Sequence, residues 1–166
     1  MASVRRRVLD VITNHLRSQL VPIHAKSVRQ DLLGYVQVGG DGCPCVFVVT
    51  AEEGGATEHL PYREVRETMQ FALIGYAVSQ TGKADGVMQA REDLLGHVMA
   101  ALYAEDLSGN VVLIEALLAD ARNNNKNGAI DARHSAPPGT DGGFAPPFGI
   151  FRLPCVAILH YRRNQV

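Results

Sequence analysis

The amino-acid sequence predicts an α+β fold: a mostly antiparallel β-sheet flanked by two main helices, with one long polar loop before the last strand. Two periodicities predict this class. Apolar residues recur every three or four positions in two segments, as on one side of a helix, and at every second position in others, as in a strand. The chain has 166 residues, of which 46% are hydrophobic, so we expect a single domain over residues 1–166 with a buried core.

The two predicted helices cover residues 3–20 and 84–104. Ser3 can cap the first, and Pro22 ends it. Each carries an apolar stripe that can be buried on one face of a sheet. The stripe residues are Val4, Val8, Val11, Ile12, Leu16 and Leu20 in the first helix, and Val87, Leu94, Leu95, Val98, Met99 and Leu102 in the second.

Strands are predicted at residues 45–50, within 62–80 and at 148–163, and residues 25–38 and 111–114 are expected to be extended as well. The long middle strand is apolar on both faces. We therefore expect a helix or a neighbouring subunit to cover its second face. Ile74 and Tyr76 alternate with Leu73 and Ala77, and their side chains are predicted to point outward, which makes them candidate interface residues.

A change in composition marks residues 123–147, which are rich in Asn, Gly, Pro and Asp and predict a long insertion loop. A segment this polar buries too little surface to offset the entropy of ordering it. However, Phe144 and Phe148 flank Pro146-Pro147, which is more apolar material than a spacer needs. The loop is either a simple surface insertion or a contact arm, and these two phenylalanines are candidate contact residues.

Composition and motifs argue against an enzyme. Lys and Arg number 16 and Asp and Glu 17, so the net charge is -1, which argues against a general affinity for nucleic acid, although a polyanion could pass without binding through a channel that the protein lines. The histidines are scattered, and neither a nucleophile elbow nor a phosphate-binding loop is found. We predict no catalytic residues and no cofactor.

The cysteine pattern predicts no metal centre. Cys43 and Cys45 are separated by one residue, whereas redox and zinc motifs use two, and a second ligand pair is missing. Asp93 and His97 lie four residues apart on the second predicted helix and are expected to be a solvated pair. A small thiol enzyme remains an alternative because it would use Cys43 or Cys45 as a reactive thiol.

Membrane insertion and export are not expected. No apolar run is long enough to span a bilayer, and the basic residues 1–7 precede a stretch broken by Asp10, Asn14 and Arg17, which differs from a signal peptide. We expect the protein to stay in the cytoplasm where it is made.

In the order of its segments, the chain resembles the tail terminator proteins of long-tailed bacteriophages. The matching segments are the N-terminal helix from residue 4, the buried strand 44–50 followed by Glu52-Glu53, the strand 69–77, the helix segment 91–98 and the closing strand 148–161. The loop at 123–147 is longer than is usual for that family. The resemblance runs over nearly the full chain.

The resemblance implies a structural virion protein of the tail and neck, assembled in the host cytoplasm. It implies a homo-oligomer, a hexameric ring, that caps the tail tube protein, ends tube polymerisation and joins the tube to the head connector or neck proteins, with DNA in transit through the central channel. The family has no catalytic residues. The alternatives are another neck or tail tube subunit, a small cytoplasmic thiol enzyme, or a nucleic-acid-binding module.

Overall fold

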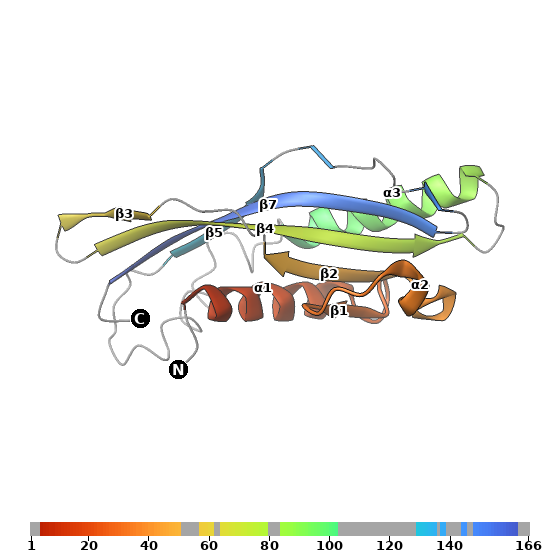
Figure 1. Cartoon of the computed structure of the whole chain (residues 1–166), viewed down its shortest axis with the longest axis horizontal. Coiled ribbons are helices and arrows are strands. Elements are labelled where there is room, and N and C mark those ends of the chain that lie inside the picture. Colours follow the sequence, from red (N-terminus) through yellow and green to blue (C-terminus); the bar gives the residue numbers. More distant parts are fainter. Residues whose placement is uncertain are drawn as a thin grey trace.

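The computed structural model of the chain describes residues 4–50, 57–61, 64–79, 84–102, 129–135, 137–138, 144–145 and 148–162. These residues confirm the α+β class, with three α-helices and a mixed, mostly antiparallel sheet (Figure 1). The elements are α1 (Val4–Leu20), β1 (Ser27–Arg29), α2 (Tyr35–Val38), the 3-10 turn η1 (Gly40–Gly42), β2 (Cys45–Thr50), β3 (Thr57–His59), β4 (Glu64–Val78), α3 (Ala84–Leu102), β5 (Ala129–His134), β6 (Phe144–Ala145) and β7 (Phe148–Arg162).

The sheet is built around one long antiparallel ribbon. Strands β4 and β7 pair along 15 residues each, from Glu64 opposite Arg162 to Val78 opposite Phe148. At roughly 3.4 Å per residue the ribbon is about 50 Å long. The main strand order is β1-β2-β4-β7-β5, and the short strands β3 and β6 pair with β4 and β7. Among the described strands, β1 alone is parallel to its neighbour, β2.

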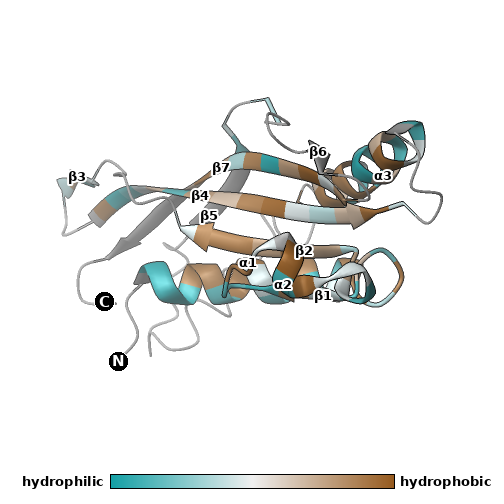
Figure 2. Cartoon of the chain, turned by 45° about the vertical axis from the view of Figure 1, so that its right-hand side comes forward, coloured by the Kyte–Doolittle hydropathy of each residue, from teal (hydrophilic) through white to brown (hydrophobic). Residues whose placement is uncertain are grey.

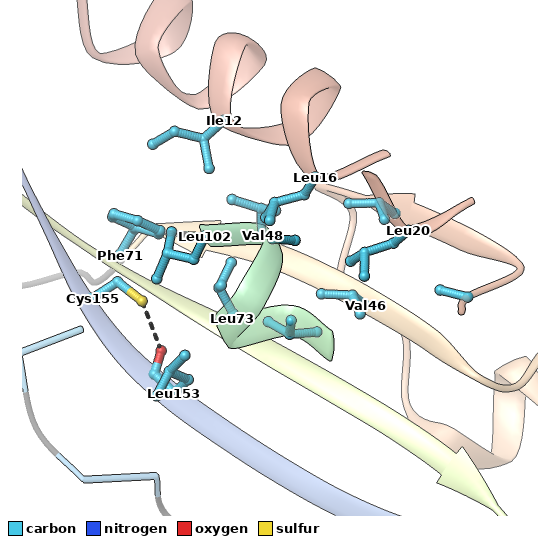
Figure 3. Packing of buried hydrophobic residues seen from close by; sticks show 14 of the residues in the cluster. Ile12, Leu16, Leu20, Val46, Val48, Phe71, Leu73, Leu102, Leu153 and Cys155 are labelled. Carbon is cyan, nitrogen blue, oxygen red and sulfur yellow. Dashed lines mark hydrogen bonds between the residues drawn. The ribbon is translucent and has the colours of Figure 1, made fainter. Parts of the chain in front are cut away.

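Both long helices pack against the same side of the sheet, which we call the first face. Leu16 and Leu20 of α1 and Leu102 of α3 are buried together with Leu73 of β4 and Leu153 of β7 (Figure 3). The two helices are also joined by a hydrogen bond, since His15 Nε2 donates to the Ala101 carbonyl at 2.8 Å. Most residues of the predicted apolar stripes lie in this core: Val8, Ile12, Leu16 and Leu20 of α1, and Leu94, Leu95, Val98 and Leu102 of α3.

Close packing on the first face requires glycine at two positions of the ribbon. A Cβ atom at Gly75 would overlap the ring of Phe151, which lies directly opposite on β7. A Cβ atom at Gly149 would lie 2.9 Å from the Arg91 Cβ and 3.0 Å from the Val87 carbonyl oxygen, because α3 crosses β7 there. These contacts fix where the ring and the helix rest on the sheet.

Two expectations about extended or irregular segments are wrong in part. Residues 25–38 contain the strand β1, but Tyr35–Val38 form a helical turn. The polar region 123–147 contains two strands, β5 and β6, that pair with β7. Pairing through backbone groups needs no apolar side chains, so composition did not reveal these strands. The strand expected at 111–114 lies outside the described residues.

The Gly75–Phe151 contact gives a test of stability. Gly75→Ala should lower the free energy of unfolding by about 1–3 kcal/mol because the added methyl overpacks the core. The loss should be smaller in a Phe151→Leu background, where the obstructing ring is gone. Urea denaturation measures both.

Gly96→Ala is the matched control, because a Cβ atom at Gly96 on α3 meets nothing. It should raise the stability by about 0.5–1 kcal/mol through helix propensity. Equal stability of the Gly75→Ala variant and the wild type would show that the ring is not held against Gly75.

Candidate functional site

Three of the four predicted interface residues meet on the sheet's other side, the second face. The register places Tyr76 opposite Ile150, and Val78 opposite Phe148. Ile74, Tyr76 and Phe148 belong to one apolar cluster on this face, separate from the core under the helices. The fourth residue, Phe144, lies in β6 opposite Gly149, at the same end of the ribbon.

Tyr76 is not exposed as predicted. Its side chain is only 6% exposed, its hydroxyl donates a hydrogen bond to the Leu33 carbonyl at 2.8 Å, and its ring lies 5.4 Å from that of Phe47. The prediction is wrong because the chain's own segment 33–43 packs over this part of the second face. Burial also raises the pKa of Tyr76, and the nearby Cys45 and Cys43 thiols raise it further. Tyr76 therefore holds the segment 33–43 against the second face and is not itself a surface residue.

Beside Tyr76 the second face is only half covered. Five apolar side chains from three neighbouring strands are partly exposed there, and we call them the apolar strip. They are Val49 of β2, Ile74 and Val78 of β4, and Phe148 and Ile150 of β7. The covering segment adds the exposed side chains of Leu32 and Val36, which are 49% and 76% exposed. Figure 2 shows the hydrophobic colouring on α2, β2 and β7.

The thiols of Cys43 and Cys45 are buried in the second-face cluster. A hydrogen bond from Cys45 holds the pKa of the Cys43 thiol below its usual value, and the same bond, with burial, raises the pKa of Cys45. Burial raises the pKa of Cys155 on the first face to about 12. Within the described residues, no group of three His, Cys, Asp or Glu side chains is placed to hold a metal ion.

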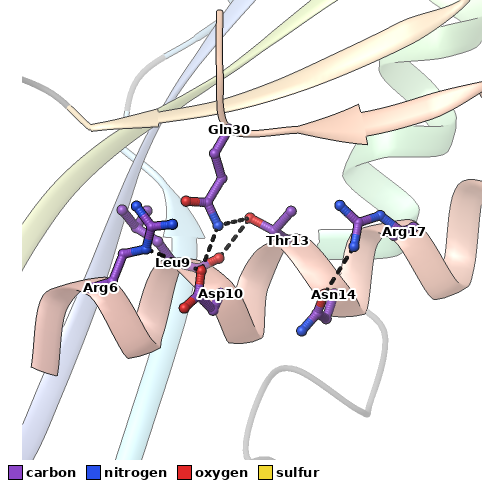
Figure 4. Close-up of polar contacts among 7 residues, drawn as sticks. All are labelled: Arg6, Leu9, Asp10, Thr13, Asn14, Arg17 and Gln30. Atoms are coloured by element: carbon purple, nitrogen blue, oxygen red, sulfur yellow. Dashed lines mark hydrogen bonds and ion pairs between the residues drawn. The ribbon is translucent and has the colours of Figure 1, made fainter. Parts of the chain in front are cut away.

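A polar groove of about 710 Å³ lies between α1 and the residues that follow β1. Gln30 bridges the two sides, because its Nε2 donates to Asp10 Oδ1 at 2.8 Å and to Thr13 Oγ1 at 3.1 Å (Figure 4). Arg17 donates to Asn14 Oδ1 at 3.1 Å and to the Val28 carbonyl at 2.8 Å. These bonds hold the edge strand β1 against α1.

Positive charge prevails in the polar groove, which is lined by three arginines and two aspartates. Arg6 pairs with Asp10 at 3.4 Å, and Arg29 forms a two-pronged pair with Asp31 at 2.7 and 3.1 Å, which lowers the pKa of that carboxyl. Within the part of the chain that the structure describes, the partners of Arg17 are the neutral groups of Asn14 and Val28, so its charge faces the groove without a carboxylate there.

This groove was not predicted from the sequence. Its α1 residues recur at helical spacing and thus share one side of the helix, which is a detectable signal. However, Arg29, Gln30 and Asp31 come from a separate segment, and only the fold brings them to α1.

His97, which lies four residues after Asp93 on α3, has a ring-stacking partner that was not predicted from the sequence. Its ring stacks on that of His24, with ring centroids 3.8 Å apart and an interplanar angle of 20°. Both histidines line a pocket of about 210 Å³ together with Asp93. Because the rings lie face to face, the contact joins the turn after α1 to α3.

No family model matches the chain, and no curated protein sequence matches it. Among the described residues, no helix has both the length and the apolar character that a membrane crossing requires. Two surfaces of the chain are its candidate functional sites: the half-covered apolar strip and the polar groove.

The buried thiols give a test that separates a structural protein from a thiol enzyme. At pH 8, labelling of all three cysteines by a disulfide reagent should be slow and limited by unfolding, because each thiol is buried. Cys43→Ala should leave folding and assembly unchanged. Rapid labelling of native Cys43 or Cys45, or stoichiometric zinc by elemental analysis, would contradict this prediction.

Proposed function

We propose that this chain is a structural subunit of a bacteriophage tail that assembles into a ring. The ring caps the tail tube, ends tube polymerisation and provides the joint to the head connector, and DNA passes through its centre. The observation that carries the proposal is the apolar strip, which the chain itself covers only in part.

Contiguous, partly exposed apolar side chains on a soluble domain mark a surface that another protein covers. The strip crosses three hydrogen-bonded strands, so its side chains are held on a rigid platform. Polar residues border the strip. Arg152 lies opposite Ile74, and Gln70 lies four residues before Ile74 on β4; both side chains are exposed. An apolar centre with a polar rim is the usual composition of a protein–protein interface.

Ring formation also requires two different surfaces on each subunit, because heterologous contacts repeat head to tail until they close. The main path of the sheet ends in β1 on one side and in β5 on the other. The two margins are unlike: β1 is a parallel strand bordered by the polar groove, whereas β5 is antiparallel. Two unlike margins on each subunit are what a head-to-tail ring contact requires.

The resemblance to tail terminators adds support. The segments on which it rests correspond to α1, β2, β4, α3 and β7, in that order. The net charge of -1 suits a channel through which DNA slides without binding. The burial of all three thiols argues against a thiol enzyme.

Replacing single side chains of the strip tests the proposal. Ile74→Asp and Ile150→Asp should leave the monomer folded but prevent it from forming rings or capping tail tubes, because a carboxylate would have to be buried in the interface. Electron microscopy and sedimentation of the purified protein, with and without tail tubes, would measure this.

Ile23→Asp is the matched control, because Ile23 is 85% exposed and lies outside the strip. It should assemble like the wild type. If the strip variants cap tubes normally, the strip is not the interface. If the wild-type protein forms long cylinders in place of rings, the chain is a tube subunit.

A further inference from the structure

The charged surfaces point to a contact between neighbouring copies of the chain. We propose that the polar groove along α1 receives the acidic outer side of α3 from the next copy in the ring. This inference rests on the proposed function, because it specifies how the ring subunits join. It adds a second surface to the apolar strip.

The exposed side of α3 carries three carboxylates. Asp85, Glu92 and Asp93 are exposed, and we call them the acidic ridge. Among the described residues, the exposed positions of α3 include no Lys or Arg. Arg91, whose side chain is only 11% exposed, donates to Glu92 Oε1 at 3.0 and 3.3 Å and so fixes one carboxylate of the ridge in place.

The groove and the ridge match in charge and in length. The groove presents Arg6, Arg17 and Arg29, and among the described residues the charge of Arg17 faces no carboxylate. With a rise of about 1.5 Å per helical residue, Arg6 and Arg17 lie about 16 Å apart along α1, and Asp85 and Asp93 about 12 Å apart along α3. The ridge therefore fits within the groove, and a carboxylate beside Arg17 would form a charge-assisted hydrogen bond.

The two surfaces lie on different helices, which pack side by side on the first face. Helix α1 packs against β1 and β2, at one margin of the sheet, whereas α3 packs against β4 and β7 (Figure 1). A groove along one helix that binds a ridge on the other is a contact between two unlike surfaces, and such contacts join copies head to tail. That is the kind of contact that closes into a ring.

A nucleic acid is the less suitable occupant of the groove. Asp10 and Asp31 line the groove together with the arginines, so it carries only a small excess of positive charge. A continuous phosphate backbone would meet both carboxylates, whereas a single carboxylate on a helix can lie beside Arg17, away from the two arginines that are paired with aspartates.

Charge reversal on each surface tests the contact. Arg17→Glu and Asp93→Arg should each weaken ring assembly at 50 mM salt by about tenfold or more, because each places like charges together. The double variant should assemble within about threefold of the wild type. Light scattering and electron microscopy measure assembly, and circular dichroism checks the fold.

An equimolar mixture of the two single variants is the most specific test of the groove–ridge contact. In such a mixture each reversed groove meets a reversed ridge, and each native groove meets a native ridge, so an even-numbered ring can close with alternating copies. Mixed rings should form although neither variant assembles alone. If Arg17→Glu unfolds the chain by losing its bonds to Asn14 and Val28, Arg6→Glu replaces it, because the Arg6 side chain is 63% exposed.

The outcomes separate this inference from the proposed function. Wild-type rings together with normal assembly of both single variants, or no assembly of their mixture, would overturn the groove–ridge contact and leave the ring proposal standing. Intact rings with reduced, salt-dependent DNA binding by Arg17→Glu would assign the groove to DNA and also overturn it. A wild-type protein that never forms rings, even on tail tubes, would instead reject the proposed function.

Discussion

The β4–β7 ribbon is the element on which the rest of the fold depends. Its 15 paired residues per strand form one long platform, to which β2 and β1 add on one side and β5 on the other. The two strands are far apart in the sequence, so their pairing joins the ends of the segment 79–147 and brings α3, which belongs to that segment, back over the sheet. Side chains alternate along the ribbon, and the pairing register therefore decides at once what belongs to the core and what belongs to the surface.

The register produces two faces with different tasks. On the first face, Gly75 gives room to Phe151 and Gly149 gives room to α3, so that the helices pack closely over the core. On the second face, the segment 33–43 is the part of the described chain that packs against the sheet, anchored by the bond from the Tyr76 hydroxyl to Leu33, and the apolar strip beside it stays half covered. This difference between the two faces fits the proposal that another protein covers the apolar strip.

The sequence predicted the parts of this fold that local periodicity determines. Helices α1 and α3 and the strands β2, β4 and β7 lie close to their predicted ranges, since each carries its own apolar pattern. Long-range effects were not predictable in this way. Tyr76 is buried by a distant segment, and β5 is held by backbone pairing to β7. Likewise, the polar groove combines Arg17 with Arg29 and Gln30, which only the fold brings together. Of the four predicted interface residues, Ile74 and Phe148 lie in the half-covered cluster, as partly exposed residues of the apolar strip.

Apolar and charged surfaces would contribute differently to an assembly of such subunits. Burying the apolar strip supplies affinity that is insensitive to salt and to small errors in orientation, because the hydrophobic effect has no direction. Exposed ion pairs add little, about 0.2–1 kcal/mol each, but like charges brought together are strongly disfavoured, so they select one register and one partner. A ring needs both, since affinity without orientation yields aggregates and orientation without affinity yields monomers. Strip and groove lie on different parts of this chain, the second face and the β1 margin, so the two requirements can be met by separate sets of residues.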